Sequence, residues 1–387
     1  MNDTKSSENL LKTPAEQDKG FLKAAADLLD LKRSYHFAEH TYHRPTDLPD
    51  SKLSGTGLFN VVVALGGTSG YYPPLAEMEL AHRDIRERLR HLVNKVTNII
   101  DAGPGSFQAV IFKSSPTVSA LLQDRQTSIN TGQLRYFAID MQFEAAAAAT
   151  TTIRNLYSNS SNVKVMPTIT DDFTRPRPLD LAEGRSLILL YGLTASQFPI
   201  TGKLNSQTCN QERMHNQLSA VTSASHVSFE DMMTNFRTMI KGNGYILMTI
   251  DTNNDGGSAL DAYRGRYFRE FKENTWHMLR MAARDPRNGI DHERGGSFNP
   301  NAMRYTPRWD EDNSRIIHAF RSDKDQVIHI NGIAHPISSG TTYNTGYSYK
   351  WSTVHALTAA EIAGWKPVHI FDHNSSPVKA LLLRAMP

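Results

Sequence analysis

An alternation of apolar runs with helical segments across residues 75–251 constrains this chain's fold more than any other feature. The run SLILLYG, residues 186–192, is almost entirely apolar, which is typical of a strand buried on both faces of a sheet. The segments between such runs carry apolar residues at helical spacing. Because strands that alternate with helices are joined by right-handed crossovers, the sequence predicts a parallel sheet with helices on both faces.

The expected strands and helices of this block can be read along the chain. The strands are VTNIIDA (96–102), LRYFAID (134–140), VKVMPTITDDF (163–173), SLILLYG (186–192) and YILMTID (245–251). The helices between them include LAEMELAHRDIRERLRHLVNK (75–95), FEAAAAATTTIRNLY (143–157) and HVSFEDMMTNFRTMIKGNG (226–244). The second of these is predicted to be helical because alanine has the highest helix propensity.

The pattern changes after residue 251. One long helix is expected over 260–284, and a polar stretch rich in Gly, Pro and Arg follows it. The strands SRIIHAFRS (314–322) and DQVIHING (325–332) are expected to pair with each other across a sharp turn. After a helix near Thr358–Ala363, the short link HNSS between PVHIFD and VKALLLRAM predicts a terminal hairpin whose last strand runs antiparallel.

These expectations divide the chain into two parts. Residues 75–255 and 353–387 are predicted to form an α/β sheet domain. Residues 1–74, which include a helix near Phe21–Lys32, and the inserted residues 256–352 are predicted to form a smaller α+β lobe. A chain of 387 residues is long for one compact domain, which fits a large core with a second lobe.

The charge balance favours a small-molecule partner over a nucleic acid. Lys and Arg number 42 against 39 Asp and Glu, the formal net charge is +3, and the basic residues form no block. No apolar stretch approaches the roughly 20 residues that a membrane helix needs, and the N-terminus lacks the apolar core of a signal peptide. We therefore expect a cytoplasmic protein without a membrane or nucleic-acid partner.

Cysteine and histidine usage argues against a metal centre. The single cysteine, Cys209, cannot form an intramolecular disulfide or a cysteine cluster, and we expect a plain thiol in a polar loop. The spacing of His36, His40 and His43 suggests ligands, but no HExxH pattern or accompanying acid completes a site. A solvated N-terminal segment is the preferred interpretation, and no metal is expected.

The first candidate site is the turn Asp101-Ala102-Gly103-Pro104-Gly105-Ser106, directly after the first strand. Glycines there let a ligand approach the backbone closely, and the start of the next helix offers a positive dipole end. Gln108 stands where GxGxxG has its third glycine, so the turn is a shortened relative of a dinucleotide loop. A tight strand-to-helix turn without a ligand is the alternative.

Acidic residues follow the next two strands. Asp140 can accept hydrogen bonds from both hydroxyls of a ribose, or it can cap the alanine-rich helix. Asp172 is placed to accept the amino group of adenine while Phe173 covers the ring, unless both belong to an ordinary solvated loop. Because ligands of open α/β sheets bind at the carboxyl ends of the strands, these residues together are more specific than any one of them.

A fourth segment, residues 191–199 (YGLTASQFP), follows the SLILLYG strand. Its polar residues, Gln197 among them, are placed to meet a substrate at the reacting group. A loop in which Thr or Ser caps a helix is the alternative. Tyr191 itself is assigned to the cofactor side of the site.

At these four places, in this order, the chain resembles the histidine-specific methyltransferases of the ergothioneine pathway and their fungal amino-acid N-methylating relatives. The distant resemblance runs from about Leu58 to the C-terminus. It includes Leu58-Phe59 with Gly70-Tyr71-Tyr72-Pro73 and Glu77 (similar to "LF…YYPT..E"), residues 191–197 ("GSTIGN"), Ala262-Tyr263 ("AYDD") and residues 345–351 ("TEVSxKF").

The resemblance implies a class I methyltransferase with a Rossmann-like sheet, S-adenosylmethionine as cofactor and an amino-acid-type small molecule as substrate. The cofactor would contact Asp101, Gly103, Gly105, Asp140, Asp172, Phe173 and Tyr191. The substrate would contact Tyr71, Gln197, Tyr263, His318 and Ser348. Tyr71, and after it Tyr263, would accept the proton of the amine or hold its lone pair forward.

Several family residues are replaced in this chain. The glutamate that grips the imidazole corresponds to Gly346, the asparagine of "GN" to Gln197, and a methionine to His318. Losing the buried acid should weaken histidine binding by an amount on the order of several kcal/mol, so we expect α-amino methylation of an amino acid other than histidine. S-methylation of a methionine-like thioether, which needs no base, and a catalytically silent partner subunit are the alternatives.

Overall fold

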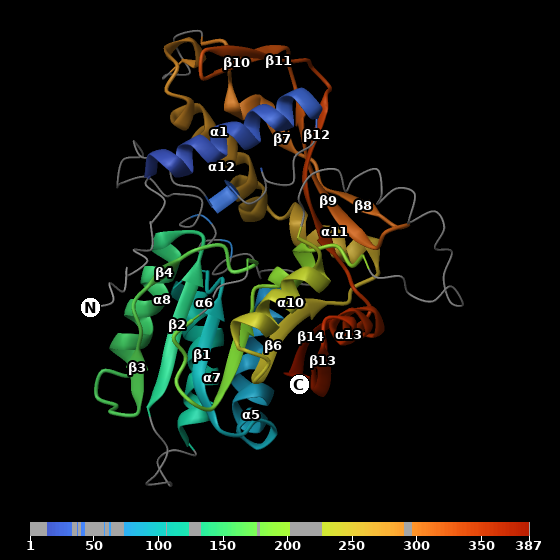
Figure 1. Ribbon diagram of the computed structural model, residues 1–387. Helices are drawn as coiled ribbons and strands as arrows, with labels where there is room; N and C mark the ends of the chain where they lie inside the picture. The colour runs from blue at the N-terminus through green and yellow to red at the C-terminus, as the bar shows by residue number, and fades with distance from the viewer. Residues whose placement is uncertain are drawn as a thin grey trace, which may run out of the picture.

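The computed structural model describes residues 14–32, 37, 40–42, 58, 62, 73–105, 107–123, 133–175, 179–201, 227–289 and 296–386. They form a large α/β domain and a second part above it that is built from α1, α11, α12 and β7–β12 (Figure 1). We call this second part the inserted lobe. Its residues 256–349 lie in the chain between strands β6 and β13 of the large domain.

The large domain contains one eight-stranded sheet with the order β13-β14-β6-β5-β1-β2-β3, in which β4 also pairs with β2. Its strands are β1 (Val96–Ala102), β2 (Leu134–Asp140), β3 (Val163–Val165), β4 (Ile169–Thr170), β5 (Arg185–Leu190), β6 (Gly244–Asp251), β13 (Trp365–Asp372) and β14 (Val378–Ala385). Strands β2, β1, β5 and β6 are parallel neighbours, and β14 runs antiparallel to both β6 and β13. The predicted parallel sheet with a terminal antiparallel hairpin is therefore confirmed.

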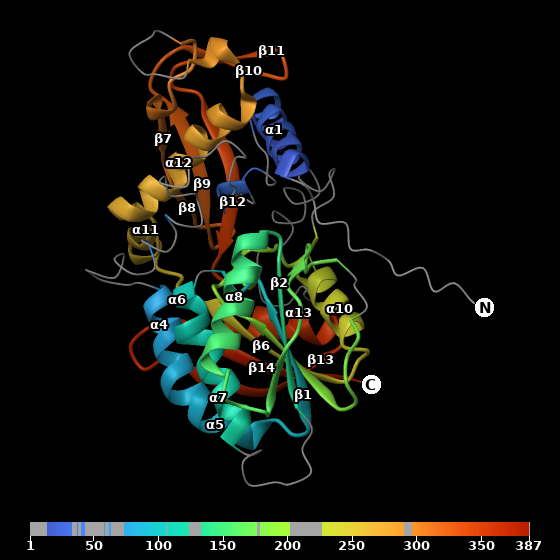
Figure 2. The same cartoon turned by 90° about the vertical axis from the view of Figure 1, so that its left-hand side faces the viewer.

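Helices cover both faces of this sheet (Figure 2). One face packs against α4 (Pro73–Leu80), α5 (Arg86–Leu92), α7 (Ser115–Gln123) and α8 (Phe143–Leu156), and the other against α10 (Phe229–Met239) and α13 (Thr353–Ile362). Side chains alternate between the two cores, since Ile99 belongs to the first and Ile100 to the second. Burial on both faces explains why β5 and β6 are nearly continuous apolar runs.

Three predicted elements have different boundaries in the structure. The segment expected as one strand over 163–173 forms two short strands, β3 and β4, because Pro167 between them has no N–H to donate to the sheet. The helix expected over 75–95 includes π-helical residues Ala81–Ile85 between α4 and α5. The helix expected near 358–363 begins earlier, at Thr353, where Ser352 accepts a hydrogen bond from the His355 N–H.

The inserted lobe has its own core. Its main sheet has the order β12-β9-β7, with β8 paired to β9, and β10 and β11 form a separate hairpin. Helix α1 packs against α12, and Phe21, Leu28, Trp276, Leu279 and Phe320 are all buried between these elements. The elements are α1 (Pro14–Leu31), α11 (Gly256–Arg264), α12 (Arg266–Ala283), β7 (Met303–Tyr305), β8 (Arg308–Asp310), β9 (Arg315–Ser322), β10 (Gln326–Ile330), β11 (Ile333–Ile337) and β12 (Thr342–Tyr349).

The prediction that SRIIHAFRS pairs with DQVIHING was wrong. The first of these forms β9, which pairs with β12, β7 and β8, and the second forms β10, which pairs with β11. The turn that makes the hairpin is Asn331-Gly332, where both residues have positive φ (51° and 82°), as a two-residue hairpin turn requires. It follows β10, so β10 folds back onto the next strand.

The prediction of one long helix over 260–284 was also wrong. Gly265, with φ −53° and ψ 146°, leaves the helical conformation and separates α11 from α12. Helix α11 begins at Gly256, because the Asp255 carboxylate accepts hydrogen bonds from the N–H groups of Gly257 and Ser258. None of the described helices is long and apolar enough to span a bilayer.

Candidate active site

The glycine turn after β1 lies at the carboxyl edge of the parallel strands. Gly103 and Gly105 have φ of 67° and 70°, a region that side chains other than glycine rarely adopt. The Gly103 N–H donates to the Ile139 carbonyl at 2.8 Å, which ties the turn to β2. A Cβ on Gly103 would lie 3.1 Å from the Phe173 ring, so the turn and this ring are close neighbours.

Asp101 supports the turn from inside. Its buried carboxylate accepts a hydrogen bond from the Tyr136 hydroxyl at 2.5 Å and another from Ser114. Burial raises the pKa of Asp101 to about 6, against the opposing effect of Ser114, Tyr136 and Lys113. The structure thus commits this predicted cofactor residue to contacts within the protein.

Asp140 ends β2 beside the same turn. Its carboxylate accepts the Gln142 N–H at 2.9 Å and also the Gly105 N–H. Burial raises the pKa of Asp140 to about 6, and the nearby Asp101 adds to the effect. The Asp140 carboxylate therefore holds the glycine turn and the end of β2 together.

Asp172 and Phe173 follow β4. One Asp172 oxygen accepts from both the backbone and the hydroxyl of Thr174, at 3.0 and 2.5 Å, and the other pairs with Arg175 at 3.0 Å. Phe173 stacks on Phe236 of α10 with ring centroids 6.1 Å apart. Its ring is thereby fixed between the glycine turn and a helix of the opposite layer.

Three buried polar atoms at this edge have no hydrogen-bond partner within the described ranges. They are Gln108 Oε1, Thr170 Oγ1 and Ser196 Oγ, on the segments that follow or end β1, β4 and β5. Leaving such a group unsatisfied costs about 1–3 kcal/mol. A polar ligand bound at this carboxyl edge could form the missing hydrogen bonds.

The loop after β5 is anchored by Glu77, to which the sequence analysis gave no role of its own. One Glu77 oxygen accepts from the N–H groups of Gly192 and Leu193, at 2.6 and 3.1 Å, and from the Thr249 hydroxyl. The other pairs with Lys113 at 2.7 Å, and both side chains are buried. Glu77 thus fixes the backbone of this loop from helix α4.

The two predicted site residues of the loop after β5, Tyr191 and Gln197, lie in different surroundings. The Tyr191 hydroxyl is 2.8 Å from Thr117 Oγ1 on α7, and burial raises the pKa of this phenol. Tyr191 therefore belongs to the helix layer behind the sheet. Gln197 ends the short helix Thr194–Gln197 and is exposed.

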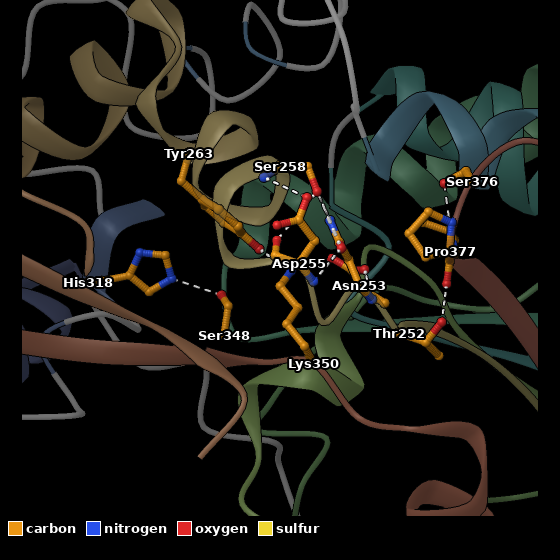
Figure 3. A network of polar contacts seen from close by, with 12 residues as sticks. Thr252, Asn253, Asp255, Ser258, Tyr263, His318, Ser348, Lys350, Ser376 and Pro377 are labelled. Carbon is orange, nitrogen blue, oxygen red and sulfur yellow. Dashed lines mark hydrogen bonds and ion pairs between the residues drawn. The ribbon is translucent and has the colours of Figure 1, made fainter. Parts of the chain in front are cut away.

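Tyr263 meets a buried ion pair where the chain passes between the two parts of the molecule. The Lys350 ammonium pairs with Asp251 at the end of β6 and donates to the Tyr263 hydroxyl at 3.1 Å (Figure 3). The side chains of the pair are fully buried. Burial alone would lower the pKa of Lys350, but Tyr263 and Asp251 outweigh it and raise this pKa.

His318 and Ser348 lie beside Tyr263. His318 Nε2 is 2.8 Å from the Ser348 hydroxyl, and Nδ1 is 2.5 Å from the Tyr305 hydroxyl. The His318 ring meets the Tyr263 ring edge-on at 5.3 Å. Burial, together with Lys272 and Lys350, lowers the pKa of His318 well below its usual value, so the imidazole is neutral.

The structure thus brings the predicted residues together in two groups. Gly103, Gly105, Asp140 and Phe173 meet at the edge of the sheet, with Asp172 in the same loop as Phe173 and Asp101 behind them. Tyr263, His318 and Ser348 meet in the inserted lobe. Tyr71, Cys209, His36 and His43 lie outside the described residues. Among the described residues, no three His, Cys, Asp or Glu side chains gather as metal ligands.

Glu77, Asp251 and Lys350 are the residues that sequence reasoning missed. Glu77 and Lys350 stand inside segments that carry the family resemblance, so their positions were a signal, but no local pattern reveals what they contact. Glu77 is 115 positions from Gly192 and Lys350 is 99 positions from Asp251.

Solved structures of other methyltransferases are similar to this chain at low sequence identity. The chain is similar to the CcbJ methyltransferase from Streptomyces caelestis (12% identity, 84% of this chain and 96% of that chain covered, TM-score 0.33). It is also similar to the 1,6-didemethyltoxoflavin-N1-methyltransferase of Burkholderia thailandensis (8%, 89% and 94%, TM-score 0.33) and to the sugar N-methyltransferase KedS8 from Streptoalloteichus sp. ATCC 53650 (10%, 89% and 98%, TM-score 0.33).

No curated protein matches the chain at a significant level. The profile of the histidine-specific, S-adenosylmethionine-dependent methyltransferases, by contrast, matches residues 50–385, which is most of the sequence and includes both parts of the molecule. The chain belongs to this family and is an S-adenosylmethionine-dependent methyltransferase.

Proposed function

We propose that this enzyme methylates a heteroatom of a small free amino acid or amino-acid derivative, that the α-amino nitrogen is the atom methylated, and that histidine is not the substrate. The observation that carries the proposal is the pairing of Gly346 with His318 across β12 and β9. Where the family resemblance implies a glutamate for the imidazole, this chain has no side chain, and its neighbour is a neutral histidine. Gly346 supplies no carboxylate to an imidazolium at this position.

The residues at the sheet edge fit S-adenosylmethionine. We propose that Asp140 binds its ribose and that Asp172 and Phe173 bind its adenine. Gly103 and Gly105 would let the cofactor approach the backbone most closely. The three unpartnered polar atoms along this edge support the assignment, because a polar ligand would satisfy them. Asp101 and Tyr191 would act from behind, by holding the glycine turn and the helix layer in place. When bound, the cofactor supplies a methyl group activated on a sulfonium.

On the substrate side, the protein must align an unprotonated nucleophile with that methyl group and exclude water. We assign the substrate contacts to Tyr71, Gln197, Tyr263, His318 and Ser348. Tyr71 is the first candidate for receiving the proton of the amine, and Tyr263 the second. The Lys350 ammonium holds the Tyr263 hydroxyl in one position, which supports an aligning role for this phenol.

S-methylation of a methionine-like thioether is the second candidate. It is favoured by the aromatic walls that Tyr263, Phe268 and Tyr305 form around His318. A thioether needs no base, and a soft sulfur packs well against aromatic rings. In either case we place the reaction in the cytoplasm, on a small molecule.

Incubation with isotopically labelled cofactor and a panel of amino acids tests the proposal. Mass spectrometry of the products identifies the methylated atom. We expect an N-methyl product from at least one amino acid other than histidine, whereas an S-methyl product would favour the second candidate. Preferred methylation of histidine, or of no amino acid at all, would overturn the proposal.

A further inference from the structure

We propose that the inserted lobe binds an anionic group of the substrate through Arg264, Arg269 and Lys272, beside Tyr305. This inference rests on the proposed methylation of an amino-acid-type substrate and narrows its class. The substrate would be an acidic amino acid or a derivative that carries a second carboxylate, in addition to its α-carboxylate.

A depression of about 410 Å³ marks the place. It is lined by Arg264 at the end of α11, Arg269 on α12, and Tyr305, Thr306 and Pro307. Within the described ranges, neither arginine side chain forms an ion pair or a hydrogen bond. Arg266, which stands between them in the sequence and does not line the depression, pairs with Glu270 at 2.8 Å. The two arginines that face the depression are thus the ones left for a ligand.

Lys272 adds a third positive charge on the same helix. It follows Arg269 by three positions, so the two side chains lie on neighbouring parts of one helix face. Its ammonium lies 5.4 Å from the ring centres of both Phe268 and Phe271, and no carboxylate of the described residues pairs with it. Burial lowers the pKa of Lys272 to about 8, the expected result for a cation that lacks a counter-ion.

Tyr305 stands between the depression and the substrate side of the proposed active site. Tyr305 lines it, and the Tyr305 hydroxyl contacts His318, whose ring packs against Tyr263. The anionic group would sit at the arginines and the reacting group beside Tyr263, with the buried Tyr305 and His318 side chains between them. His318 is neutral and adds no charge of its own.

The acidic residues nearby are already engaged or do not pair with these cations. Glu270 binds Arg266, Glu273 accepts the Tyr305 N–H at 3.0 Å, and Asp251 pairs with Lys350. Asp261 on α11 is exposed and forms no ion pair with the three cations. The described part of this surface thus carries uncompensated positive charge. Paired guanidinium groups are well suited to a carboxylate, which accepts two parallel N–H bonds from each.

Calorimetry with the full-length enzyme loaded with S-adenosylhomocysteine tests the site. The probes are L-aspartate, L-glutamate and L-2-aminoadipate, compared with L-asparagine and L-glutamine. We expect at least one acid to bind about 10-fold more tightly than the amides, the loss of a charge-assisted hydrogen bond being worth about that factor. The double variant Arg264→Gln/Arg269→Gln should abolish this preference, and Lys272→Met should reduce it.

Arg266→Gln is the matched control, because this arginine has the same chemistry on the same helix but is already paired. It should keep the preference for the acid. Equal binding of acids and amides, an unchanged preference in the double variant, or equally tight binding of inorganic phosphate in the wild type would overturn the proposal.

Measuring binding and methylation separately distinguishes a failure of the anion site from a failure of the proposed function. If an acid binds through the arginines but no amino acid is methylated, the anion site stands and the proposed function fails. If neutral amino acids are methylated and bind more tightly than acids, the proposed function stands and the anion site fails.

Discussion

The edge of the parallel sheet and the aromatic region of the inserted lobe differ in the hydrogen-bonding groups that they contain. At the sheet edge, where we propose that the cofactor binds, turns with positive φ and the carboxylate of Asp140 offer backbone groups and acceptor oxygens. In the lobe, aromatic rings and the ammonium groups of Lys350 and Lys272 surround a neutral histidine. Acceptor oxygens thus predominate at the sheet edge, and donor groups predominate around His318. A variant in one should therefore leave the other's ligand unaffected.

The largest expected effect concerns the ion pair that joins the two regions. Lys350→Met leaves the Asp251 carboxylate buried and unpaired, which should lower the free energy of unfolding by about 3–5 kcal/mol. Chemical denaturation measures this. Lys379→Met is the control, since it removes a partly exposed pair with Asp372 worth less than about 1 kcal/mol. Equal losses in the two variants would show that the buried pair has no special role.

Asp140→Ala should weaken cofactor binding and leave substrate binding unchanged. Removing the carboxylate that we propose accepts the ribose hydroxyls should weaken cofactor binding by a factor of about 100, since charge-assisted hydrogen bonds are worth about 1.5–3 kcal/mol each. Calorimetry measures the affinity, and the exposed Asp180→Ala serves as the control. Unchanged affinity would remove Asp140 from the site.

Cofactor affinity should also depend on pH. The raised pKa of Asp140, about 6, means that its carboxylate is ionised above pH 6 and progressively protonated below it. Because the ionised form accepts hydroxyl donors better, affinity should fall about 10-fold per pH unit below 6. The Asp140→Asn variant should show a flat profile. Asp101 titrates in the same range, so a profile that flattens only in Asp101→Asn would assign the effect to that residue instead.

Tyr263→Phe should lower kcat and leave the cofactor affinity unchanged. Losing the hydroxyl that Lys350 holds should lower kcat about 10-fold, a typical loss for one aligning hydrogen bond, while the cofactor affinity stays within about twofold. Steady-state kinetics and calorimetry test the two parts. Tyr267→Phe, on the adjacent turn of α12, is the control. A loss of cofactor affinity in Tyr263→Phe would break the separation between the two regions.

The smallest effect is expected at Gln197, which is exposed at the end of the loop after β5. Gln197→Ala should raise KM by a few-fold, since a solvated hydrogen bond contributes about 0.5–1.5 kcal/mol. Wild-type kinetics would exclude this residue from the substrate site. Gln123→Ala, in helix α7, provides the comparison.

The two regions also differ in how far the sequence predicts them. Parallel strands bring their carboxyl ends to one edge, so the order of Gly103, Asp140 and Phe173 along the chain was enough to group them. In the lobe, pairing is long-range: β9 pairs with β12, and neither period nor propensity specifies that partner. The break between α11 and α12 at Gly265 was not predicted, because the helical pattern on both sides of this single glycine favoured one continuous helix.

The Asp251–Lys350 pair has a consequence for how this enzyme could be altered. The chain leaves the large α/β domain just after Asp251 and returns just after Lys350, so both junctions of the insert coincide at one ion pair. A segment with adjacent ends can be exchanged as a cassette, provided that its replacement keeps this ion pair and the packing of α12 against α1. Under the proposed assignment of the two regions, grafting residues 252–349 together with α1 from a relative, while retaining this pair, should change the substrate and leave cofactor binding unchanged.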